Sequence, residues 1–227
     1  MTFTHKNILN LSLLALLAFF SFLMLRIIFI YIPVQTDVGF LQLKQSYINI
    51  TPWRIAFFVH VFSSMLVLLA GFTQFSKKLL RSNKKLHRTF GYIYVIDILM
   101  VTGPAGLLMS FYANGGLPSR IAFVMLSILW ISFTAIALRK AIQKDFRAHR
   151  IWMIRSFALT LSAITLRAWK VGLAYVTEIG PMDRYRVIAW LGWTVNLIVA
   201  EVIIYRVQRA KSLNHDLLDG RKGRIRG

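Results

Sequence analysis

Long apolar stretches alternate with short polar segments along most of this chain of 227 residues. A helix that crosses the hydrocarbon core of a bilayer needs roughly 20 predominantly apolar residues. The polar segments between the stretches are short, so we expect short loops and no separate soluble domain. The pattern predicts six transmembrane helices, over about Ile8–Ile32, Arg54–Phe75, Thr89–Phe111, Arg120–Ala141, Ile151–Val176 and Val187–Val207.

The composition agrees with an all-α membrane protein. Hydrophobic residues make up 57% of the chain and the mean hydropathy is +0.59, whereas only 16% of the residues are charged. Soluble domains carry about a quarter charged residues. We therefore expect residues 1–227 to form a single polytopic helical bundle. The chain has no cysteine, which excludes thiolate catalysis, thiolate metal sites and iron–sulfur clusters.

Basic residues, which give a formal net charge of +20, gather in alternate polar segments. The segments after the second and fourth apolar stretches and the tail 208–227 are rich in Lys and Arg, and the segments between them are poor in both. Lys and Arg near helix ends collect on the cytoplasmic side. Both termini are therefore predicted to be cytoplasmic, with the chain in the cytoplasmic membrane of a bacterium. We expect the lipid bilayer and its anionic headgroups as partners, and no nucleic acid.

Several polar side chains interrupt the predicted spans. Ionisable groups in hydrocarbon are costly, and those that persist usually mark a pathway or a site. These residues are His60, Gln74, Asp97, Arg155, Arg167, Asn196 and Glu201. From the rise per residue of a helix, Asp97, Arg155 and Glu201 form an inner layer. That layer indicates either a proton or substrate path or an ion-pair network that only orients the helices.

His87 and His149 form a second candidate site. Each belongs to a His-Arg pair at the start of a predicted span, and aromatic residues follow both pairs. At matched depth, two neutral imidazoles could bind the iron of haem b from opposite sides, while Arg88 and Arg150 neutralise its propionates. The alternatives are contacts with headgroups or backbone, or a histidine/carboxylate metal site whose nearest acid is Asp145.

Several motifs resemble a family of bacterial six-helix membrane proteins, the domain of unknown function numbered twenty-three hundred and six. They are His60 with Gly71 and Gln74, Leu86-His87-Arg88-x-x-Gly91-x-x-Tyr94, His149-Arg150-x-Trp152-Met153-Ile154-Arg155-Ser156, Arg167, and Asn196 with Glu201. The resemblance covers about residues 53–206 and implies the bundle but no reaction. The chain is more loosely similar to haem-binding cytochromes of the b561 type. Those carry two haems on four histidines, whereas this bundle offers three candidates.

The sequence thus favours a haem-binding electron-transfer protein in which His60 and Arg167 form an outer, quinone-like pocket. A small transporter or proton-coupled carrier that uses Asp97, Arg155 and Glu201 is the first alternative. A non-catalytic accessory subunit is the second. The residues do not decide whether the protein is an enzyme, and they name no substrate.

The charge pattern predicts the topology. A reporter fused after Gly227 should read cytoplasmic, and one inserted near Gly115 should read external, because basic residues flank the first position and are sparse around the second. Reporter activity in intact cells measures both. A C-terminal tail accessible only from outside would contradict the orientation.

Overall fold

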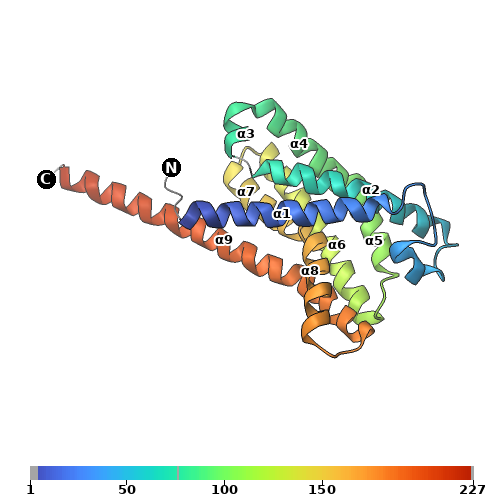
Figure 1. Ribbon diagram of the computed structural model, residues 1–227. Helices are drawn as coiled ribbons and strands as arrows, with labels where there is room; N and C mark the ends of the chain where they lie inside the picture. Colours follow the sequence, from blue (N-terminus) through green and yellow to red (C-terminus); the bar gives the residue numbers. More distant parts are fainter. Residues whose placement is uncertain (1–4, 76, 226–227) are drawn as a thin grey trace.

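The structure, a computed structural model, describes residues 5–75 and 77–225, and this part of the chain is helical without strands (Figure 1). Its elements are α1 (His5–Phe29), η1 (Gly39–Lys44), α2 (Thr51–Gln74), α3 (Lys77–Ser82), α4 (Lys84–Asp97), η2 (Ile98–Thr102), α5 (Gly103–Ser110), α6 (Leu117–Ile142), α7 (Phe146–Thr160), α8 (Ser162–Val176) and α9 (Pro181–Ile225).

Five helical segments of the described chain are long and apolar enough to cross a membrane. They are Thr51–Gln74, Lys84–Ser110, Leu117–Ile142, Phe146–Val176 and Pro181–Arg209. The predicted all-α membrane bundle is thereby confirmed. In the first predicted span the described apolar helix, Ala18–Phe29, is shorter. A sixth transmembrane helix in this first span therefore stays a prediction, as does the cytoplasmic location of both termini. In Figure 1, α1 begins and α9 ends toward the same side of the bundle.

The third span is continuous, as predicted, although it contains Gly103-Pro104, a dipeptide that disturbs helices. The chain passes from α4 through η2, a π-helical turn, into α5, and the Gly103 amide donates to the Ile98 carbonyl oxygen. Pro104 has no amide proton to give to the preceding turn, so the wider turn replaces a normal one. A Cβ on Gly103 would lie 2.2 Å from that carbonyl oxygen. Glycine is therefore required at this position.

The fifth span is interrupted, although the sequence predicts one helix over Ile151–Val176. It divides at Leu161 into α7 and α8. The side-chain amide of Asn196 on α9 donates to the Ala158 carbonyl oxygen and to the Thr165 hydroxyl, each at 3.0 Å. Thr165 in turn donates to the Gly192 carbonyl oxygen at 2.5 Å. The interruption is therefore satisfied by hydrogen bonds from the neighbouring helix, as buried backbone in a membrane requires.

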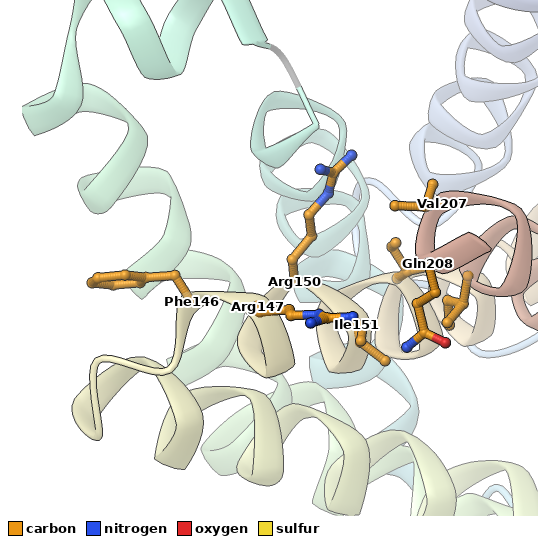
Figure 2. Close-up of a pocket in the computed structure, with 8 residues that line it drawn as sticks. Phe146, Arg147, Arg150, Ile151, Val207 and Gln208 are labelled. Carbon is orange, nitrogen blue, oxygen red and sulfur yellow. The ribbon is translucent and has the colours of Figure 1, made fainter. Parts of the chain in front are cut away.

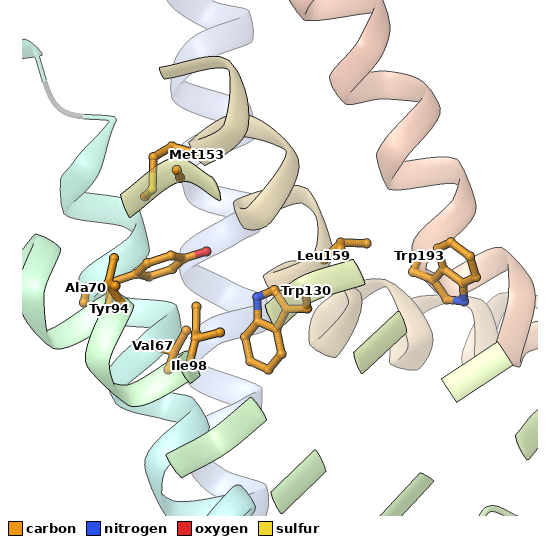
Figure 3. Close-up of a cluster of buried hydrophobic side chains, with 10 residues drawn as sticks. Val67, Ala70, Tyr94, Ile98, Trp130, Met153, Leu159 and Trp193 are labelled. Atoms are coloured by element: carbon orange, nitrogen blue, oxygen red, sulfur yellow. The ribbon is translucent and has the colours of Figure 1, made fainter. Parts of the chain in front are cut away.

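A buried hydroxyl network joins α4, α6 and α7 at the centre of the bundle. The Tyr94 hydroxyl bonds the hydroxyls of Ser156 and Thr160, both at 2.8 Å. Ser156 also bonds Thr134 at 2.7 Å, and Trp130 Nε1 donates to Thr160 at 3.0 Å. Figure 3 shows the Tyr94 hydroxyl and the Trp130 nitrogen directed toward this shared centre, with Met153 and Ile98 packed around them. Hydrogen bonds between helices thus reinforce the apolar packing.

One end of the bundle is closed by a buried lysine on η1. Lys44 is 2% exposed, and its Nζ donates to the Tyr112 carbonyl oxygen and, at 2.6 Å, to Asn114 Oδ1. The Tyr47 ring centre lies 5.1 Å from the same nitrogen. Burial, with a smaller contribution from Arg120, lowers the pKa of Lys44 to about 8. The lysine therefore ties the segment after α1 to the α5–α6 loop.

Tyr94→Phe should lower the thermal stability of the protein in detergent by the equivalent of about 1 kcal/mol, the scale of interhelical hydrogen bonds in membranes. The change removes only the hydroxyl that bonds Ser156 and Thr160. Tyr92→Phe is the matched control, because Tyr92 is 61% exposed on the same helix. Equal melting temperatures for the two variants would mean that the network adds no stability.

Candidate functional site

His87 and His149 are brought together by the register of α4 and α7. Each histidine stands seven residues before a member of the hydroxyl network, His87 before Tyr94 and His149 before Ser156. Seven residues are about two helical turns. The Tyr94–Ser156 bond therefore sets both histidines at one level of the bundle.

The two imidazole rings are held differently. His149 Nδ1 lies 2.8 Å from the Ala137 carbonyl oxygen on α6. A carbonyl only accepts, so Nδ1 carries the proton and Nε2 keeps its lone pair. His87 Nδ1 is buried and has no hydrogen-bond partner in the described part of the chain. His149 therefore offers a lone pair on an oriented ring, and His87 offers a buried nitrogen without a hydrogen-bond partner. Together these two nitrogens suit a ligand that lies between the rings.

The polar residues around the histidines have separate roles. Gln74 Nε2 donates to the His87 carbonyl oxygen at 3.1 Å and so joins the end of α2 to the start of α4. A Cβ on Gly91 would lie 3.1 Å from Gln74 Oε1, so glycine allows this close approach. Arg88 is exposed, and Arg150 borders a cavity between α7 and α9. Gln74 therefore positions backbone, whereas the arginines supply charge near the two rings.

The expected inner layer of three charges divides into two parts. Arg155 forms a bidentate ion pair with Glu201, with Nε at 2.6 Å from Oε1 and a second nitrogen at 2.9 Å from Oε2. The guanidinium also lies 4.6 Å from the Trp152 ring centre. Within the described residues Asp97 forms no ion pair with either group. The Arg155–Glu201 pair links α7 to α9, which is the role of an orienting contact.

Asp97 belongs instead to a hydroxyl chain at the middle of the bundle. Its side chain is 8% exposed and accepts a hydrogen bond from the Thr102 hydroxyl on η2. Thr102 Oγ1 lies 2.5 Å from Ser63 Oγ on α2, and Ser63 reaches the Val59 carbonyl oxygen at 2.7 Å. Asp97 is the central residue of the span Lys84–Ser110, about 20 Å from either end. A carboxyl group at this depth is a candidate proton-binding site.

His60 faces the same turn as this chain. His60 Nδ1 lies 3.0 Å from the Thr102 carbonyl oxygen, and the ring is within electrostatic range of Asp97 and Arg167. A Cβ on Gly106 would lie 3.0 Å from the His60 ring, so the glycine makes room for it. Arg167 donates at 2.6 Å to the Ala163 carbonyl oxygen on its own helix. His60 and Arg167 thus each contact a backbone carbonyl oxygen, and in the described part of the chain no hydrogen bond joins the two side chains.

The sequence analysis did not identify Thr102 and Ser63, which form the hydroxyl chain at Asp97. One signal was present, because Thr102 directly precedes Gly103-Pro104, a dipeptide that disturbs helices. π-Helical turns are rare and occur often at functional sites. Asn196, by contrast, satisfies backbone at the α7–α8 interruption, which is a structural role.

Comparison with known proteins supports the membrane assignment and adds no activity. A family model described as "Predicted membrane protein (DUF2306)" matches residues 57–204, well over half of the chain. The resemblance drawn from the histidine and arginine motifs is thereby confirmed. Neither the curated proteins nor the solved structures contain a match.

Proposed function

We propose that this chain, which belongs to the DUF2306 family of predicted membrane proteins, binds haem b and transfers electrons within the membrane. The observation that carries the proposal is that His87 and His149 stand seven residues before Tyr94 and Ser156, whose hydroxyls bond each other, so that both histidines lie at one level of the bundle. His149 donates its Nδ1 proton to the Ala137 carbonyl oxygen. A second hydrogen bond of this kind orients metal-binding histidines in general and leaves Nε2 for the metal.

The donor set fits haem iron better than a bare metal ion. In the described residues no group of three or more His, Cys, Asp or Glu side chains could hold a metal ion. A haem needs only two axial ligands from the protein, because the porphyrin supplies the equatorial nitrogens. The Nδ1 atom of His87 is buried and has no hydrogen-bond partner within the described residues. Two histidines without a nearby carboxylate are therefore sufficient for this cofactor and for few others.

The surrounding residues would support the group in two ways. Arg88 and Arg150 follow the two histidines and can pair with the haem carboxylates. When bound, the haem would supply one-electron chemistry. His60 with Arg167, nearer the opposite end, is our candidate for the quinone-like pocket, since it combines a ring nitrogen with a positive charge.

An absorption spectrum tests the proposal. Protein expressed with haem available should show a Soret band after purification, and His87→Ala and His149→Ala should each abolish it. The control is His60→Ala, which removes a membrane histidine outside the pair and should leave the band intact. A colourless wild-type preparation, or a band that survives both ligand substitutions, would overturn the proposal.

A second candidate function is proton transfer through Asp97, either alone or coupled to a solute. Its support is that the hydroxyl chain accepts both protonation states of the carboxyl group. With Asp97 ionised, Thr102 donates to the carboxylate and Ser63 donates to Thr102. With Asp97 protonated, the direction of each hydrogen bond can reverse. Asp97 then donates to Thr102, Thr102 donates to Ser63, and Ser63 donates to the Val59 carbonyl oxygen at 2.7 Å. Each hydroxyl therefore keeps a hydrogen bond when Asp97 gains or loses a proton, and no heavy atom has to move.

Proton flux into liposomes tests this function. Wild-type protein in vesicles that contain a pH-sensitive dye should admit protons under an imposed potential. Asp97→Asn should abolish the flux, and Ser63→Ala should reduce it because the chain is cut. Ser64→Ala is the control, since within the described residues Ser64 bonds only the Val61 carbonyl oxygen of its own helix. Equal flux in the wild type and Asp97→Asn would exclude the path.

A further inference from the structure

A cavity of about 290 Å³ lies between the first turns of α7 and the segment of α9 around Gln208. Its polar lining consists of Arg147, Arg150 and Gln208, and its apolar lining includes Ile151, Ile154 and Ile204. In Figure 2 the Arg147 guanidinium and the Gln208 amide extend toward each other beside Ile151, and Arg150 projects to another side. The cavity thus has a positively charged rim and an apolar wall.

The donors on this rim are unused. Neither arginine forms a hydrogen bond or ion pair within the described part of the chain, so their guanidinium protons are available. The nearest acid along the sequence, Asp145, is engaged elsewhere: it accepts from the Ala148 amide at 3.0 Å and lies 3.9 Å from Lys140 Nζ. Glu201 on α9 is paired with Arg155. The rim therefore carries positive charge that no neighbouring carboxylate neutralises, and it is complementary to an anion.

The position of the cavity decides between a soluble anion and a lipid. Phe146 is the first residue of a candidate span, and Arg147 follows it directly. Arg147, and with it Gln208 across the cavity, therefore lies at the level where a bilayer has its headgroups. Ile151, Ile154 and Ile204 lie about one to two turns deeper along the same two helices. An anionic head with attached acyl chains matches both parts of the lining.

We infer that this cavity is a binding site for an acidic phospholipid. The phosphate lies against Arg147, since a guanidinium group binds phosphate oxygens in a bidentate manner, and against the Gln208 amide that extends toward it. The acyl chains lie along the isoleucines of α7 and α9. The site is specific in that it selects a negatively charged headgroup over a zwitterionic one, and it is independent of haem at His87 and His149 and of the Asp97 chain.

Native mass spectrometry of the full chain, released from nanodiscs, tests the site. Nanodiscs that contain phosphatidylglycerol should yield protein with retained lipid, and nanodiscs of phosphatidylcholine alone should yield little. Arg147→Gln should weaken phosphatidylglycerol retention about fivefold, as expected for one basic residue near anionic lipid. Arg147 is chosen because Arg150 also belongs to the proposed haem site. Arg139→Gln is the control, because Arg139 is exposed on α6 and does not line the cavity.

The remaining arms separate the competing explanations. Inorganic phosphate added to the phosphatidylcholine sample should not remain bound, and retention of phosphate in place of lipid would overturn the assignment. Equal retention of the two phospholipids, or equal weakening by Arg147→Gln and Arg139→Gln, would show that basic charge acts without a site. Loss of retention in Arg147→Gln with an unchanged melting temperature supports the site, because a folding defect would lower both.

Discussion

The hydrogen bond between Tyr94 and Ser156 is the constraint on which the rest of the bundle depends. In hydrocarbon there is little hydrophobic drive for one helix to prefer another, so packing and interhelical hydrogen bonds set the register. This bond, with those to Thr160 and Thr134, fixes α4 and α7 against α6. Because His87 and His149 each lie two turns from it, a register shift of one turn would separate the rings by about 5 Å in height.

Because polar groups in hydrocarbon need partners, the polar residues of the spans can be divided into structural residues and candidate site residues. Gln74 and Asn196 donate to backbone carbonyl oxygens, and Arg155 with Glu201 neutralise each other. The polar groups of these residues have partners within the fold, so their role is structural. His87, by contrast, keeps a buried nitrogen without a partner. Burying such a group costs free energy without a compensating hydrogen bond, and a bound ligand would remove that cost.

The histidine pair, the arginine-lined cavity and the Asp97 chain occupy two levels of one scaffold. The histidine pair and the cavity lie near the end at which α4 and α7 begin, and the Asp97 chain lies at the centre of its span. α7 contributes to two of them, since His149 and Arg147 project from its first turns. Lipid and haem could therefore bind together, with α7 as the common element.

The sequence by itself determined the helical membrane bundle and the positions of five spans, because the length of an apolar stretch and its polar flanks are local properties. It also singled out His87, His149, Asp97 and Glu201, because ionisable groups are conspicuous in such stretches. Only the tertiary structure decided the partners. Sequence depth placed Asp97 beside Arg155, but depth gives no rotation about the bundle axis, and Asp97 bonds Thr102 while Arg155 bonds Glu201. The π-helical turn, the α7–α8 interruption and the cavity at Arg147 likewise arise from contacts between distant segments, which no local pattern records.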